Sequence, residues 1–173
     1  MTDLAAVADK LEIIEVCTRT HWCYDHEAWD GLAASFADTV SMPTVAQVTG
    51  DPDFDAGTYL GRYLFTRAEV TRALRSFRDG LVTQHLIAGH QVTLDGDRAV
   101  CLAHSINIHL PAGSGPDAGL LAHGNEYRFD LIRTAEGWRI RGWIPRVRWS
   151  YGDDSSHDVA AKQQAWLARG KNT

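Results

Sequence analysis

The sequence predicts an α+β domain, in which N-terminal helices pack on a strongly curved mixed or antiparallel sheet and enclose a cone-shaped cavity. Two observations lead to this fold class. Over the first part of the chain, apolar residues recur every three or four positions, which is the period of an amphipathic helix. After Gly80 the period changes to two, as in strands, and long alternating segments continue as far as Trp149.

The first predicted helix covers residues 3–24 and has Thr2 or Asp3 as its N-cap, since both side chains can accept hydrogen bonds from free backbone N–H groups. A second, shorter helix begins near Trp29, where helical spacing of apolar residues returns. The apolar stripe of the first helix consists of Leu4, Val7, Leu11, Ile14, Cys17, His21 and Tyr24.

The segment that follows these two helices contains a weak indication of a strand and a strong indication of a third helix. Residues 39–48 alternate only loosely and contain Pro43, so they are expected to form at best an edge strand. The third helix is defined by Thr66 and Glu69, which have the spacing of a capping box, and by Gly80, which ends it.

The sheet is predicted from alternating segments that cover residues 81–94, 98–110, 120–133 and 138–149. Asp95-Gly96 is a strong hairpin signal, so the first two segments should pair antiparallel. In the second segment, His104 is expected to point inward, because it shares a face with apolar residues. Those neighbours are Val100, Leu102, Ile106 and Ile108. Asn125 and Tyr127 lie on the apolar face of the third segment.

Length and composition indicate one domain over residues 1–173, with a final helix over residues 155–169. A formal net charge of −5 argues against nucleic acid or an anionic membrane as a partner. Cys17, Cys23 and Cys101 lack C-x-x-C spacing and are expected to be reduced thiols. Neither a signal peptide nor a membrane-spanning apolar run is found, so a cytoplasmic protein is expected.

A candidate site is predicted where the first helix ends. Tyr24 and Asp25 lie near its buried side, and an unpaired carboxylate in such a place is costly, so Asp25 should have a partner. His85 and His104, both in strand-like apolar segments, are the candidate partners. A carboxylate, a tyrosine and two histidines around an apolar cavity indicate acid–base chemistry.

Some of these residues are also compatible with other kinds of site. His104 taken alone could be a structural core histidine. Two histidines and a carboxylate could also form a facial triad for iron, but no H-x-H or H-x-D pair occurs among them, so no metal is expected. No G-x-S-x-G, G-x-G-x-x-G or P-loop motif is present, so neither a serine nucleophile nor a nucleotide cofactor is expected.

Three segments of the chain resemble scytalone dehydratase and the SnoaL-like members of the nuclear transport factor 2-like superfamily. They are residues 23–30, which contain Tyr-Asp and then Trp29, residues 83–89 around His85, and residues 136–149. The resemblance covers roughly residues 10–150. It implies the curved-sheet fold described above and a cavity that serves as an active site.

The resemblance also implies roles for particular residues. Tyr24, Asp25, His85 and His104 fall on four of the family's active-site positions. In such enzymes, the histidine beside the carboxylate moves a proton next to a carbonyl, the second histidine assists the departure of a hydroxyl, and the tyrosine polarises the carbonyl. Catalysis of this kind needs no cofactor.

The expected substrate contacts are Asn125, Tyr127, Thr44, Trp29 and Trp149. A second family tyrosine falls at Thr44, which is too short to replace it, so Tyr127 is a candidate to supply the missing phenol. Asn125 and Tyr127 stand at the family's serine and asparagine positions. Trp149 is expected at the mouth of the cavity.

The function expected from these features is a dehydratase that removes water β to a carbonyl of a small cyclic or polyketide-like substrate. A polyketide cyclase or isomerase using the same site, and a non-catalytic small-molecule-binding domain, are the alternatives. Arg139, Arg141 and Trp143 are expected on the outer face of the sheet, and similar proteins assemble as dimers or trimers. A homo-oligomer is therefore expected.

Overall fold

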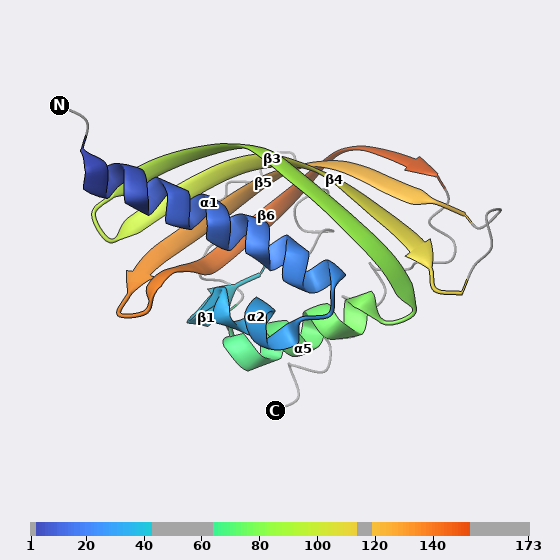
Figure 1. The fold of residues 1–173 in the computed structure, drawn as a ribbon. Helices are drawn as coiled ribbons and strands as arrows, with labels where there is room; N and C mark the ends of the chain where they lie inside the picture. Colours follow the sequence, from blue (N-terminus) through green and yellow to red (C-terminus); the bar gives the residue numbers. More distant parts are fainter. Residues whose placement is uncertain (1–2, 43–63, 114–118, 153–173) are drawn as a thin grey trace.

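The computed structural model describes residues 3–42, 64–113 and 119–152 (Figure 1). Thr44, Pro43 and the predicted helix over residues 155–169 lie outside these ranges. In chain order the elements are α1 (Leu4–Asp25), α2 (Trp29–Ala34), β1 (Phe36–Ser41), β2 (Leu64–Thr66), α5 (Arg67–Arg78), β3 (Leu81–Asp95), β4 (Arg98–Pro111), β5 (Leu121–Thr134) and β6 (Gly137–Gly152). No helix in the described ranges has both the length and the apolar character needed to span a bilayer.

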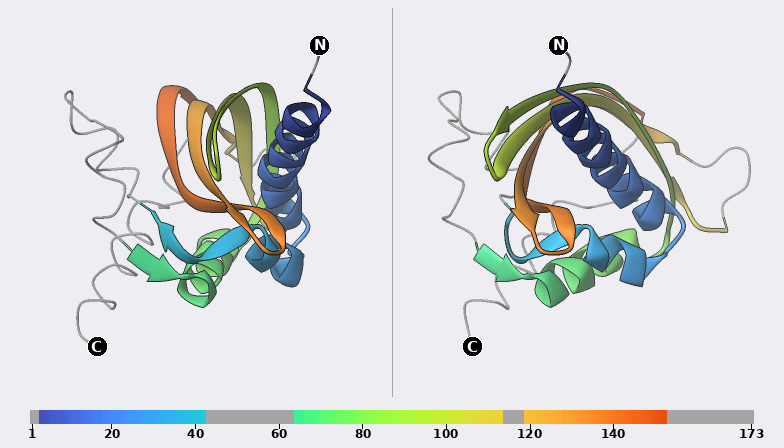
Figure 2. Two further views of the ribbon diagram at one scale, coloured as in Figure 1. Left: turned by 90° about the vertical axis from the view of Figure 1, so that its left-hand side faces the viewer. Right: turned by 60° about the vertical axis from the view of Figure 1, so that its left-hand side comes forward.

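The strands form one six-stranded mixed sheet in the order β2-β1-β6-β5-β4-β3. β1 runs parallel to β6, whereas the other neighbouring pairs are antiparallel. The long strands bend into an arch, and α1, α2 and α5 lie on its concave side (Figure 2). The predicted α+β fold class is confirmed.

The position of β1 corrects one expectation. An edge strand was expected over residues 39–48, but β1 begins earlier, at Phe36, and lies between β2 and β6. Its neighbours come from distant parts of the chain, as in the pairs of Thr39 with Thr66 and of Phe36 with Ile140. Such long-range pairing leaves little trace in the local sequence.

The helix ends follow the capping rules. Asp3 caps α1, since its Oδ1 accepts hydrogen bonds from the backbone N–H groups of Ala5 and Ala6 at 3.0 and 3.3 Å. The predicted capping box of α5 is present: Thr66 Oγ1 accepts from the Glu69 N–H, and a Glu69 oxygen accepts from the Thr66 N–H. After α5 the chain turns at Gly80, whose φ of 75° favours glycine.

The core lies between α1 and the concave face of the sheet. The side chains of α1 that reach it begin at Ile13, whereas Leu4 and Leu11 of the predicted stripe remain exposed. Trp138 of β6 is fully buried, and its indole N–H donates to Asp9 at 3.1 Å while its backbone N–H donates to Glu12 at 2.8 Å. The helix is therefore held on the sheet by polar as well as apolar contacts.

The two faces of β4 are the reverse of the expectation. Cys101, Ser105 and Asn107 are buried on the concave face, whereas His104 is exposed on the convex face with Leu102 and Ile106. The prediction that His104 points inward is wrong. Alternation was interpreted as apolar inside and polar outside, but here the cavity face carries polar groups and the outer face carries apolar ones.

The convex face of the sheet is rich in exposed apolar side chains. They include Val82, Leu86, Leu102, Ile106 and Trp149, with exposed fractions between 43% and 53%. An apolar patch of this kind is typical of an interaction surface. The expected homo-oligomer remains a prediction.

Two irregularities in β6 determine which way its tryptophans point. Leu131 pairs with Ile140 and Asp130 with Gly142, so an extra residue in β6 reverses the alternation at that point. As a result Trp143, expected on the outer face, lies on the cavity side, where its ring stacks on Phe36 with centroids 5.3 Å apart.

The second irregularity lies further along β6. Gly124 pairs with Trp149 and Asn125 with Val147, so the alternation shifts again. Trp149 lies against Gly124, where a Cβ would be only 2.1 Å from the indole ring. Only glycine fits beneath this tryptophan, and Trp149 faces the outer surface beside Ile106.

Candidate active site

The carboxylate at the end of α1 accepts hydrogen bonds from β3. Asp25 Oδ1 accepts from His85 Nδ1 at 2.6 Å and from Thr83 Oγ1 at 2.7 Å, and Oδ2 accepts from the His85 backbone N–H at 2.7 Å. Both side chains of the Asp25–His85 pair are nearly buried, with exposed fractions of 10% and 8%. Helix α1 therefore ends against the sheet in a hydrogen-bonded imidazole–carboxylate pair.

These contacts set the charge of Asp25 and the tautomer of His85. Burial acts to raise the pKa of Asp25, but the hydrogen bonds from His85 and Thr83 outweigh it and leave the pKa below its ordinary value. An ionised carboxylate only accepts hydrogen bonds, so His85 Nδ1 carries the proton. In the neutral ring the lone pair then resides on Nε2, which can serve as a general base.

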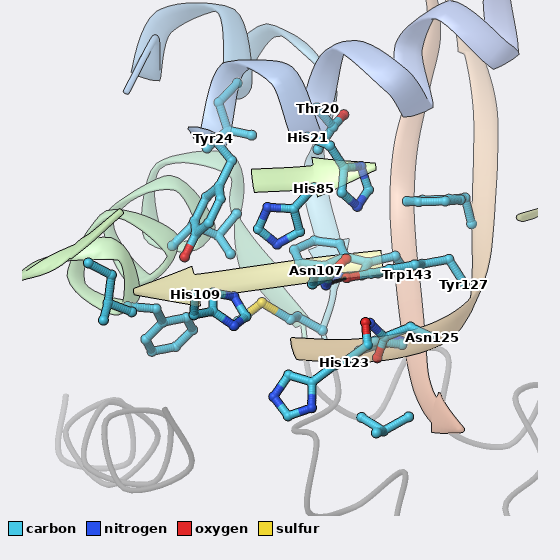
Figure 3. Close-up of a pocket in the computed structure, with 18 of the residues that line it drawn as sticks. Thr20, His21, Tyr24, His85, Asn107, His109, His123, Asn125, Tyr127 and Trp143 are labelled. Carbon is cyan, nitrogen blue, oxygen red and sulfur yellow. Dashed lines mark hydrogen bonds between the residues drawn. The ribbon is translucent and has the colours of Figure 1, made fainter. Parts of the chain in front are cut away.

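His85 lines a cavity of about 250 Å³ on the concave side of the sheet. The labelled side chains in Figure 3 come from α1, β3, β4, β5 and β6 and converge on this space. Much of the remaining wall is apolar, as at Phe77, Phe129 and Val147. Among the described residues, no Lys, Arg, Asp or Glu side chain lines the cavity, so its wall is neutral apart from its histidines.

The structure brings most of the predicted polar residues together. Tyr24, His85, Asn125 and Tyr127 all line the cavity, and Asp25 lies behind His85. The rings of Tyr24 and His85 meet edge to face with centroids 5.3 Å apart. Burial raises the pKa values of both Tyr24 and Tyr127, so each phenol is a neutral hydrogen-bond donor.

Three other predicted residues lie elsewhere. His104 is on the convex face of the sheet, and so is Trp149, which does not reach the cavity mouth. Trp29 packs edge to face on Tyr24 at 6.4 Å from outside the cavity, with the Arg75 guanidinium 5.8 Å from its ring centre. Because Trp29 starts α2 and Trp149 follows the second shift in β6, local spacing gave no information on either orientation.

The reversal of β4 places a different histidine in the cavity. His109 lines it and meets His85 edge to face, with ring centroids 5.5 Å apart. His123 of β5 follows at 5.8 Å from His109. The sequence of β4 does indicate that His109 belongs to a polar site, because His109 shares a strand face with Ser105 and Asn107 and the second half of that face is polar throughout.

A hydrogen-bonded row of polar side chains crosses the cavity wall. Ser105 Oγ donates to Asn107 Oδ1 at 2.7 Å, and Asn107 Nδ2 donates to the Tyr127 hydroxyl oxygen at 3.0 Å. Asn125 Nδ2 reaches Ser105 Oγ at 3.4 Å. Since Tyr127 accepts from Asn107, its own O–H remains directed to other acceptors, including a ligand.

One further histidine was not predicted as part of the site. His21 of α1 lines the cavity and is 8% exposed. Its Nδ1 lies 3.0 Å from the Cys17 carbonyl oxygen, one helical turn earlier. Burial, assisted by the nearby His85, lowers the pKa of His21 from 6.5 to about 4.

This pKa predicts an acid-sensitive stability. Between pH 6.5 and about 4, His21 binds a proton in the unfolded chain but not in the folded protein, so acidification through that range favours unfolding. From pH 7 to pH 5 the loss should be about 2 kcal/mol. Urea unfolding of the wild type and of His21→Phe at both pH values measures it, and His26→Phe controls for removal of an exposed imidazole, since His26 is the C-cap residue just after α1. Equal pH dependence in the wild type and His21→Phe would contradict the prediction.

In the described ranges, no group of three or more His, Cys, Asp or Glu side chains is arranged to hold a metal ion. The chemistry that the site residues can supply themselves is proton transfer, by His85 and His109, next to two neutral phenols that can stabilise a developing oxyanion.

Comparison with known proteins identifies the family to which the chain belongs. The family model of the SnoaL-like domain matches residues 5–144. A search of the curated proteins finds no match to this chain. Among solved structures, a protein from Kribbella flavida is 27% identical, covers 91% of this chain and 99% of its own, and has a TM-score of 0.66.

Two further solved structures show the same fold at lower identity. One is provisionally named a scytalone dehydratase, from Novosphingobium aromaticivorans; it is 14% identical, with 87% of this chain and 89% of that chain covered and a TM-score of 0.65. The other, from Streptomyces avermitilis, is provisionally named a dehydratase of the NTF2-like family; it is 15% identical, with 82% and 98% covered and a TM-score of 0.63.

Proposed function

The chain belongs to the SnoaL-like domain family of the nuclear transport factor 2-like superfamily, and we propose that it is a cofactor-independent dehydratase. The substrate class is a small, uncharged cyclic ketone with a hydroxyl β to the carbonyl. The observation that carries the proposal is the buried contact of 2.6 Å between His85 Nδ1 and Asp25, with the opposite edge of the imidazole at the cavity.

The proposed reaction is an elimination in which both proton transfers are made by histidines. His85 Nε2 removes the proton from the carbon next to the carbonyl, and the resulting imidazolium is stabilised by the Asp25 carboxylate. The electron pair moves through the enolate to expel the β-hydroxyl, which takes a proton from His109 and leaves as water. Tyr24 and Tyr127 donate hydrogen bonds to the enolate oxygen.

His109 takes the role first expected for His104. A general acid must lie within reach of the same substrate as the base, and the His109 ring is 5.5 Å from that of His85 on the cavity wall. His104 has no access to that space, because the sheet itself separates it from the cavity.

An isomerase or cyclase is the second candidate, since the same base and phenols suffice when no hydroxyl leaves. The neutral cavity wall and the two phenols favour enolate chemistry without deciding the fate of the enolate. A non-catalytic binding domain would have no need for the Asp25–His85 pair.

Product mass separates these functions. We expect the protein to convert 3-hydroxy-1-tetralone, a simple cyclic β-hydroxy ketone, to 1-naphthol with the loss of one water, detected by chromatography with mass spectrometry. His85→Ala serves as the control for non-enzymatic elimination. Conversion of cyclic hydroxy ketones at constant mass would mean that the protein is an isomerase or cyclase and not a dehydratase. Binding without conversion would mean that it is a small-molecule-binding domain.

A further inference from the structure

We propose that His21 determines substrate specificity, with its Nε2 accepting a hydrogen bond from a substrate hydroxyl other than the one that leaves. The proposal rests on the proposed function in one respect, namely that the cavity is the substrate site. It assigns a ligand-recognition role to a residue that takes no part in the proton transfers described above.

The tautomer of His21 follows from its contact within α1. The Cys17 carbonyl oxygen, 3.0 Å from His21 Nδ1, can only accept a hydrogen bond, so Nδ1 carries the proton. A neutral imidazole protonated on Nδ1 has its lone pair on Nε2. With its pKa at about 4, the ring remains neutral under ordinary conditions, and Nε2 is then an acceptor.

No protein donor satisfies that acceptor in the described part of the chain. His21 makes no hydrogen bond there other than the one to Cys17 and those of its helix backbone. Its ring is surrounded by other rings: Tyr127 at 5.0 Å and Phe129 at 5.9 Å, both edge to face, and His85 at 5.5 Å. His21 lines the cavity, so a hydroxyl group on a bound ligand can donate a hydrogen bond to this acceptor.

The geometry also indicates which part of the ligand is recognised. The His21 ring lies 5.5 Å from that of His85 and both line the cavity, so a substrate that places its acidic C–H at His85 has a neighbouring group within reach of His21. A hydroxyl fits the acceptor, whereas an anionic group would be repelled by its lone pair and would find no Lys or Arg side chain among the described lining residues. The ligand class is therefore an uncharged ring ketone with an additional hydroxyl.

Ligands that cannot be dehydrated test this without turnover. The probes are 1-tetralone and its derivatives with one hydroxyl at each aromatic position in turn, all of which lack a β-hydroxyl. Dissociation constants are measured by calorimetry for the wild type, His21→Phe, His21→Gln and the exposed control His26→Phe. In the wild type, at least one hydroxylated probe should bind about 3–10-fold tighter than 1-tetralone, the range of a net hydrogen bond.

The variants then separate recognition from packing. His21→Phe keeps a ring but has no acceptor, so the preference should disappear while 1-tetralone binds as before. His21→Gln carries an amide oxygen near the position of Nε2 and should restore part of the preference. A preference that persists in His21→Phe, or a wild type that binds no hydroxylated probe more tightly than 1-tetralone, would overturn the proposal.

Two measurements keep the outcome unambiguous. If His21→Phe does not fold, the wild type and His21→Gln decide together: replacing the preferred hydroxyl by a methoxy group removes the donor and should abolish the tighter binding by the wild type, and the preference for the hydroxyl should be smaller in His21→Gln than in the wild type. Turnover of 3-hydroxy-1-tetralone reports separately on the dehydratase reaction. Elimination without any hydroxyl preference would reject the role of His21 alone, whereas a hydroxyl preference without elimination would reject the proposed function alone.

Discussion

His85→Ala should lower the rate of elimination by about 10²–10⁴-fold, the contribution of one general base, while the protein remains folded. The imidazole is the group that joins the Asp25 carboxylate to the cavity, and alanine leaves no acceptor for the substrate proton. Steady-state kinetics on the substrate identified by product mass gives kcat, and circular dichroism with thermal unfolding establishes that the fold is retained.

Two further variants show whether the loss of turnover in His85→Ala depends on the hydrogen-bonded pair of His85 and Asp25. Asp25→Asn presents an amide that no longer stabilises the imidazolium, so its rate should approach that of His85→Ala. Thr83→Val removes only one of the hydrogen bonds to Asp25 and keeps the shape of the side chain, so its effect should be smaller. Wild-type turnover in a folded His85→Ala protein would eliminate the acid–base mechanism.

His109→Ala and His104→Ala should give opposite results, although the two histidines lie on the same strand. His109 lines the cavity, and its loss should reduce turnover by about 10²–10⁴-fold. His104 is exposed on the convex face, so its replacement should change the turnover rate and the equilibrium constant of unfolding by about twofold or less.

The paired variants are a direct test of the face assignment of β4. Each substitution removes one imidazole from the same strand, His104 from its outward face and His109 from its inward face, so each controls for the other. A large loss of turnover in His104→Ala together with near-normal turnover in His109→Ala would mean that His104, and not His109, faces the cavity and serves as the general acid.

Several parts of this fold are determined by short-range chemistry and were predicted from it. The capping box of Thr66 and Glu69 fixes the start of α5 because both orphan backbone donors are satisfied within one turn. The hairpin between β3 and β4 was predicted because Gly96, with a φ of 58°, readily adopts the conformation that the turn requires. The cost of burying a carboxylate without a partner predicted a histidine beside Asp25, with His85 and His104 as candidates, and the structure shows that the partner is His85.

The inward face of each strand was decided by tertiary structure alone. Alternation with a period of two defines two faces of β4, but it does not state which of them meets the helices. Apolar residues normally mark the inner face, and here they mark the outer one, so Asn107 and His109 line the cavity while Leu102 and His104 lie outside. In β6, one extra residue near Arg141 reverses the alternation and turns Trp143 inward.

The sequence by itself therefore determined the local elements of this protein and the expected pairing of the Asp25 carboxylate with an imidazole, because both depend on interactions between near neighbours or on a cost that any fold must avoid. The tertiary structure decided which histidine joins that pair and which aromatic rings surround it. Those choices depend on strand register and curvature, which arise only when segments that are far apart in the chain pack together.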